Sequence, residues 1–159
     1  DFVSGGGPET GHLSSLFSTR QQRRSADYAV RYLDSLGVPK DKMVIGAAFY
    51  SRIWKEVPRR NNGLYQKAQY HRALNYGKLD EFISSHPGFV RHRDPVAKAP
   101  YLYHPDEQLF VTYDDSLSVS LKTRYALKND LGGIMFWELG GDKPHNGLLD
   151  AIYKVKQGK

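Results

Sequence analysis

Apolar residues recur along this chain with two different spacings, and together these predict a mixed α/β structure. In Ser25–Leu36, Asp115–Asp130 and Gly147–Val155 they fall at every third or fourth position, which is typical of helices with one buried side. In Met43–Phe49 and Leu131–Leu139 they form short, nearly continuous runs, which predict strands that are apolar and buried on both faces. Helix, short loop and buried strand in this order are typical of α/β proteins.

Each of the first two helices has an apolar side that we expect to be buried. In the first helix this side consists of Ala26, Ala29, Val30, Leu33 and Leu36. In the second it includes Leu117, Leu121, Ala126 and Leu127. Ser25 is a suitable N-cap for the first helix, and Asp115 or Ser116 is suitable for the second.

The middle of the chain has a different character. It is rich in proline and aromatic residues, and turns separate its short apolar segments. These segments predict antiparallel strands at Phe89–Arg93, Tyr101–His104 and Leu109–Tyr113, and a short helix at Leu79–His86. We therefore predict an α/β frame over residues 1–54 and 116–159, interrupted by an α+β insertion over residues 55–115. Residues 1–24 are rich in glycine, serine and threonine and are predicted to be a surface loop.

The composition of the chain permits some classes of function and argues against others. Aromatic residues make up 13% of the chain, with eleven tyrosines, and their flat faces and polar edges suit sugar binding or half-buried core positions equally. The formal net charge is +6, but basic residues are not clustered, which argues against a nucleic-acid partner. No apolar run is long enough to cross a membrane. Cysteine is absent and the six histidines lack metal-ligand spacing, so neither a metal nor a cofactor is expected.

Three acidic residues are candidates for acid/base roles. Asp114 and Asp115 are adjacent carboxylates, but neighbouring residues on a strand point to opposite faces. A strand end followed by a helix cap is therefore the favoured interpretation of this pair. Asp142 follows two glycines and is interpreted as a loop or helix-capping residue.

Three longer motifs occur in one order along the chain: KMVIGAAFYSRIW (Lys42–Trp54), PYLYHPDEQLFVTYDD (Pro100–Asp115) and LGGIMFWELGGD (Leu131–Asp142). Together they resemble the seventh barrel strand, the end of an insertion domain and the eighth barrel strand of glycoside hydrolase family 18, the chitinases. Asp1-Phe2 resembles the tail of that family's Met-x-Tyr-Asp-Phe motif. Ser51 replaces the glycine of the family's Tyr-Gly-Arg motif, a change that could crowd a ligand.

The resemblance implies the C-terminal part of a (β/α)8 TIM barrel, comprising its last strands and helices with an inserted α+β subdomain. A complete barrel needs ~250 residues, and this chain has 159. The family's catalytic pattern, Asp-x-x-Asp-x-Asp-x-Glu, does not occur in it. The general-acid glutamate would then lie in an absent N-terminal part, and the chain alone would be inactive. Its open sheet edge would pair with that missing half of the barrel or with another copy.

The resemblance also implies an activity and a site. The parent protein would be a glycosidase that cleaves β-1,4-linked N-acetylglucosamine polymers such as chitin by substrate-assisted, retaining hydrolysis. Asp1 would orient the acetamide group of the sugar, Tyr50 would line the pocket, and Arg52 would hydrogen-bond the sugar. Trp137 would form the floor on which the reactive sugar stacks, with Met135 beside it. A buried core position is the alternative for Trp137 and Met135.

Other functions remain open at this point. A noncatalytic, lectin-like member of the family would share Trp137 and Arg52. A family 18 hydrolase acting on N-glycans or bacterial wall glycans is a second alternative, and a protein-interaction module outside the family is a third. The resemblance implies a secreted or extracytoplasmic protein.

The sequence also makes geometric predictions. The strands at Met43–Phe49 and Leu131–Leu139 should be adjacent and parallel. Tyr50, Arg52 and Trp137 should then converge on one concave surface, because barrel sites form at the carboxyl ends of strands. Glu138 should point away from the face that carries Trp137.

Overall fold

The computed structural model describes residues 7–158. Its helices are α1 (Ala26–Ser35), α2 (Leu79–Ser85), α3 (Ser116–Lys128) and α4 (Leu148–Lys156). Its strands are β1 (Val44–Ala48), β2 (Tyr50–Lys55), β3 (Gln69–Asn75), β4 (Val90–Asp94), β5 (Ala99–His104), β6 (Leu109–Thr112) and β7 (Gly133–Trp137). All four predicted helices are present. Four of the five predicted strand segments are close to their expected positions, and the fifth, β7, is shorter than expected.

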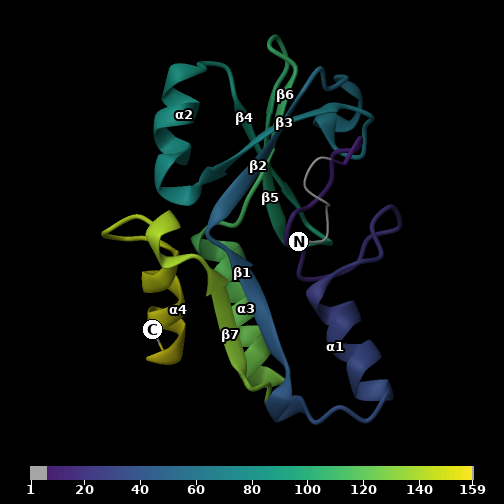
Figure 1. Ribbon diagram of the computed structural model, residues 1–159, viewed down its shortest axis with the longest axis vertical. Coiled ribbons are helices and arrows are strands. Elements are labelled where there is room, and N and C mark those ends of the chain that lie inside the picture. Colours follow the sequence, from purple (N-terminus) through teal and green to yellow (C-terminus); the bar gives the residue numbers. More distant parts are fainter. Residues whose placement is uncertain (1–6, 159) are drawn as a thin grey trace.

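Two sheets divide the described structure. β1 and β7 form a parallel pair, with Val44 opposite Gly133 and Ala48 opposite Trp137. This pairing confirms the predicted adjacent, parallel strands. The second sheet is antiparallel, has the strand order β3-β2-β6-β5-β4, and lies with α2 at the other end of the molecule (Figure 1). The described residues thus form a mixed α/β structure with one parallel pair and one antiparallel sheet.

The chain passes from one sheet to the other within two residues. β1 ends at Ala48 and β2 begins at Tyr50, so β2 pairs with β3 and β6 rather than extending the parallel pair. Tyr50–Trp54, the last part of the segment that we assigned to the α/β frame, therefore pair within the antiparallel sheet. The prediction also missed β3, whose mostly exposed, polar sequence has no apolar alternation.

β7 is covered on one face only. Ile134 and Phe136 pack against the core, whereas Met135 and Trp137 are 52% and 65% exposed. The prediction of a strand buried on both faces is therefore wrong. The described residues place α1, α3 and α4 against a single face of the parallel pair, and nothing among them covers the other.

The apolar sides of α1 and α3 are only partly buried. In α1, Ala26 and Val30 are buried, but Leu33 and Leu36, at or just beyond its C-terminal end, are exposed. In α3, Ala126 is buried, whereas Leu117 and Leu127 are exposed. The side of α3 that faces inward instead carries Ser118, Val119, Lys122 and Thr123. Lys122, on this buried side, forms an ion pair with Asp114, which lies just before the helix.

Asp114 and Lys122 form this ion pair, and both side chains are almost completely buried. The Nζ atom of Lys122 lies 2.6 and 2.8 Å from the two carboxylate oxygens of Asp114. Asp114 also accepts hydrogen bonds from the Ser118 hydroxyl at 2.7 Å and from the backbone N–H of Ala48 at 2.9 Å. Asp115 caps α3 by accepting from the Ser118 backbone N–H, as predicted. Asp114 thus has a structural role, because it connects the end of β1 at Ala48 to Lys122 of α3.

The segment before α1 is not the surface loop that its composition predicted. Thr10, His12, Leu13 and Leu16 are all buried. The imidazole of His12 lies 3.0 Å from the carboxylate of Asp94 at the end of β4, and the Leu13 N–H donates to the Thr112 hydroxyl at 2.9 Å. These contacts attach the segment to the antiparallel sheet.

Candidate functional site

A cavity of about 290 Å³ lies where β1 and β7 end and β2 begins. The residues that line it come from β2, from β3, from the last residue of β7 and from the positions just after the two parallel strands. They are Phe49, Tyr50, Arg52, Ala73, Asn75, Trp137 and Glu138. The predicted convergence of Tyr50, Arg52 and Trp137 on one concave surface is therefore confirmed.

The backbone holds the floor of this cavity in place. Phe49 donates its N–H to the carbonyl of Trp137 at 2.8 Å, and its own carbonyl accepts from Tyr76 at 3.0 Å. The Phe49 ring stacks on Phe136 with centroids 4.6 Å apart and planes 9° from parallel. Stacked rings and paired backbone groups restrict local motion. Trp137 therefore presents an exposed ring on a fixed strand end.

One wall of the cavity carries a cation held between two tyrosines. The guanidinium carbon of Arg52 lies 5.6 Å from the ring centroid of Tyr50 and 6.0 Å from that of Tyr70. Burial raises the pKa of the Tyr50 phenol, and the Arg52 guanidinium opposes this only in part. Tyr50 therefore keeps its proton at neutral pH and remains able to donate a hydrogen bond.

Glu138 lines the same cavity, contrary to the prediction that it points away from Trp137. That prediction relied on the alternation of side chains along a strand. β7 ends at Trp137, so the alternation no longer applies at the next residue. The cavity thus contains one carboxylate and one guanidinium beside an exposed indole.

Two predicted site residues have different positions. Met135 shares the exposed face of β7 with Trp137 but is not among the residues that line the cavity. Asp1 lies outside the described residues. Asp142 accepts hydrogen bonds from the backbone N–H groups of Leu148 and Leu149 at 2.8 Å, so its predicted capping role is confirmed.

A family model, Glycosyl hydrolases family 18, matches residues 1–142. The chain belongs to this family. Chitinase B from Serratia marcescens is 35% identical over 153 residues, covering 80% of this family 18 chain and 31% of that protein. The oviduct-specific glycoprotein of Papio anubis is 31% identical over 140 residues, covering 84% of this chain and 22% of that protein.

Solved structures of family 18 proteins share the fold of the chain. A family 18 N-acetylglucosaminidase from Paenibacillus barengoltzii matches 98% of the chain with a TM-score of 0.86 and 43% identity. Chitinase ChiA74 from Bacillus thuringiensis matches 99% with a TM-score of 0.88 and 30% identity. The family 18 chain spans 46% and 30% of those two chains, less than half of each. The mixed α/β fold is thus that of family 18 structures.

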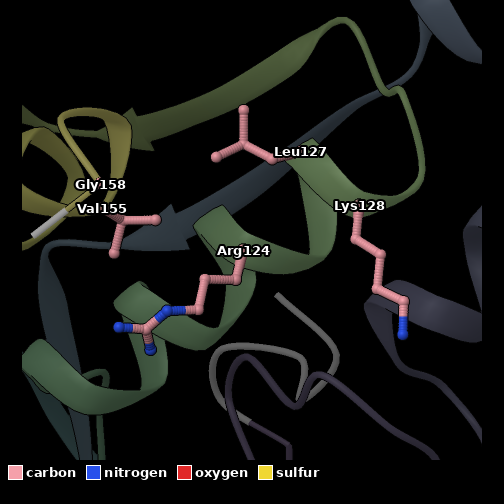
Figure 2. A pocket seen from close by; sticks show the side chains of 5 residues that line it. All are labelled: Arg124, Leu127, Lys128, Val155 and Gly158. Carbon is pink, nitrogen blue, oxygen red and sulfur yellow. The ribbon is translucent and has the colours of Figure 1, made fainter.

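Two other surface pockets of the family 18 chain lack polar side chains that converge on one point, as a ligand-binding site would have. One, lined by Arg124, Leu127, Lys128, Val155 and Gly158, lies between α3 and α4. Figure 2 shows that the charged ends of Arg124 and Lys128 point in different directions, so no polar groups converge there. The other, of about 520 Å³, is mainly apolar and follows the unpaired edge of β7.

Neither a metal site nor a membrane span is found in the described part of the family 18 chain. No group of three potential ligands is close enough to hold a metal ion in residues 7–158. None of the helices there is both long and apolar enough to cross a membrane.

The cavity residues that the sequence did not predict are Phe49, Ala73, Asn75 and Glu138. Ala73 and Asn75 belong to the missed strand β3, and no local pattern indicates them.

Proposed function

We propose that the chain is the C-terminal part of the catalytic domain of a chitinase-like glycosidase. Its substrates would be β-1,4-linked N-acetylglucosamine polymers. The observation that supports this most directly is the cavity in which Trp137, Tyr50 and Arg52 meet at the ends of parallel strands. Active sites of (β/α)8 barrels form at this end of the strands. In this proposal residues 1–54 and 116–159 complete a barrel, and residues 55–115 form its inserted subdomain.

Each cavity residue has a chemical role in this proposal. The exposed indole of Trp137 offers a flat apolar face for the C–H side of a pyranose ring. Arg52 donates hydrogen bonds to sugar hydroxyls, and the protonated Tyr50 phenol lines the pocket and offers one more donor. Met135 extends the apolar surface beside Trp137. Asp1 would orient the acetamide group, as the family resemblance implies.

Hydrolysis needs a further group. In family 18 the acetamide oxygen of the substrate itself attacks the anomeric carbon, so the enzyme supplies a general acid that protonates the leaving oxygen. We propose that this acid is a glutamate in the N-terminal part of the parent protein. Glu138 lies in the cavity but is exposed, and the proposal assigns it no proton-donating role.

Two other members of the family would fit the same cavity. A lectin-like protein would use Trp137 and Arg52 for binding without turnover. A hydrolase of N-glycans or bacterial wall glycans would use them on another N-acetylglucosamine-containing substrate. The antiparallel sheet beside the cavity favours chitin-like chains, because it supplies part of the cavity wall through Ala73 and Asn75. The name of the Paenibacillus barengoltzii relative, an N-acetylglucosaminidase, favours the same sugar unit. We place the parent protein outside the cytoplasm on the family resemblance.

The test is turnover of a chromogenic chitobioside. We expect hydrolysis by the intact parent protein and none by the 159-residue chain, since loss of general acid catalysis alone typically costs ~10²–10⁴ in rate. Binding without turnover by the intact protein would favour the lectin-like function. Robust turnover by the 159-residue chain that Glu138→Gln abolishes would make Glu138 the acid and contradict the proposal.

A further inference from the structure

An extra residue in β3 changes the direction of the side chains along that strand. Ile53 of β2 pairs with Arg72, but the next residue, Trp54, pairs with Tyr70, so His71 has no partner in the register. A bulge of this kind shifts the alternation of the side chains by one position. In a regular strand Tyr70 and Arg72, two positions apart, would point to the same face of the sheet. With the bulge at His71 between them, they point to opposite faces.

The contacts on each side of the bulge agree with this change. The Arg72 guanidinium lies 5.2 Å from the ring centroid of Phe82, a buried residue of α2. Tyr70 instead shares the side of Ala73 and Asn75, which line the cavity, and it reaches Arg52. In a regular strand Tyr70 and Arg72 would share a face, so the bulge is what brings Tyr70 to the cavity side.

Tyr70 is itself firmly supported. Its ring meets that of Trp54 edge to face, with centroids 5.6 Å apart and planes at 78°. Trp54 is completely buried, and its indole N–H donates to the carbonyl of Gly7 at 3.1 Å. The Tyr70 hydroxyl lies 3.4 Å from an Arg52 guanidinium nitrogen, a long contact. Of the two contacts that Tyr70 makes with Arg52, the one with the ring is therefore expected to contribute more than the one with the hydroxyl.

We propose that Tyr70 is a positioning residue that holds the Arg52 guanidinium in its sugar-binding orientation. The inference rests on the proposed function, because it assigns Arg52 to sugar binding. Arg52 is a long side chain that loses rotamer freedom when it binds a ligand. The rings of Tyr50 and Tyr70 restrict that freedom beforehand, which lowers the entropic cost of binding. Tyr70 is not among the cavity-lining residues, so it acts through Arg52.

The first experiment is a double-mutant cycle on the intact parent protein, with its general-acid glutamate replaced by glutamine in every variant so that the ligand is not hydrolysed. The affinity for an N-acetylglucosamine tetramer is measured by calorimetry. Tyr70→Leu should weaken binding about two- to fivefold, the range of an exposed cation–π contact. Tyr70→Phe keeps the ring and should stay within about twofold of the wild type. In the Arg52→Ala background, Tyr70→Leu should have no further effect. Tyr70→Thr, which suits a strand, replaces Tyr70→Leu if the latter does not fold.

The second experiment measures the order of the Arg52 side chain directly, by NMR relaxation of its Nε–H group without sugar. Order should fall in Tyr70→Leu and persist in Tyr70→Phe. Tyr32→Leu is the matched control, since Tyr32 is 56% exposed on α1, at the end of the molecule away from β3 (Figure 1). Unchanged Arg52 order, or equal losses of affinity with and without Arg52, would overturn the positioning role. A wild type that shows no sugar binding would overturn the proposed function, and the NMR result would still decide the role of Tyr70.

Discussion

The ion pair between Asp114 and Lys122 gives the most definite stability prediction. The Asp114→Asn variant keeps the size of the side chain but removes its charge. Both partners are buried, with side-chain exposures of 0% and 1%, so the Lys122 ammonium would lose its counter-ion at a site shielded from solvent. Burial already lowers the pKa of Lys122, and Asp114 is the main group that opposes this. The variant should therefore also lower that pKa further.

The size of the effect follows from the contacts that are lost. Breaking a buried pair by removing one partner costs about 3–5 kcal/mol, because an uncompensated charge remains. The Ala48 N–H and the Ser118 hydroxyl also share the carboxylate, and an amide has only one oxygen to offer them and Lys122. We therefore expect the free energy of unfolding to fall by about 3 kcal/mol or more.

The assay is chemical unfolding of the intact parent protein, followed by circular dichroism. Asp106→Asn is the matched control, because Asp106 pairs with Arg59 on the surface and should change stability by no more than about 1 kcal/mol. Adding Lys122→Met to Asp114→Asn should recover part of the loss, since it removes the unpaired charge. A loss below about 1 kcal/mol in Asp114→Asn, or no recovery in the double variant, would refute this reasoning.

Two further predictions concern pH and association. The hydrogen bond from His12, helped by the N–H groups of Val96 and Ala97, holds the pKa of Asp94 at about 2, below its usual 3.8. A carboxyl group with a lowered folded-state pKa stabilises the fold above its unfolded pKa, so stability should fall as the pH drops from 3.8 toward 2. In acid unfolding curves, the free energy of unfolding of Asp94→Asn should depend less steeply on pH over this range than that of the wild type. An equally steep dependence in the two proteins would contradict the prediction. The unpaired edge of β7 should make the 159-residue chain self-associate, and light scattering that shows a monodisperse monomer at high concentration would contradict this.

Local patterns in the sequence predicted the parts of the fold that depend on near neighbours. The apolar runs of β1 and β7 and the caps Ser25 and Asp115 are visible in a few consecutive residues, and all are present. Tyr50, Arg52 and Trp137 were placed correctly around one cavity because strand ends and a family motif mark them.

The remaining features depend on contacts between distant parts of the chain. β3 is an edge strand of mostly exposed residues, so its sequence carries no apolar alternation, and its bulge at His71 is visible only from the pairing. His12 is buried in a segment rich in glycine and serine because Asp94, 82 residues later, pairs with it. Lys122 faces the core from α3 although its partner Asp114 is only eight residues earlier, and a pattern of apolar positions does not indicate this pair because both side chains are charged.

The central claim is that the cavity beside Trp137 binds N-acetylglucosamine units. The most direct measurement is a calorimetric titration of the intact parent protein with an N-acetylglucosamine tetramer, comparing the wild-type residue at position 137 with Trp137→Ala. Both proteins carry glutamine in place of the general-acid glutamate, so that the tetramer is not hydrolysed. Burying a large side chain against a ligand contributes about 1.5–3 kcal/mol, so the variant should bind about tenfold to a hundredfold more weakly. Tyr153→Ala, which removes a similarly exposed aromatic ring from α4, should bind like the wild type. Equal affinities of the wild type and Trp137→Ala would contradict the claim.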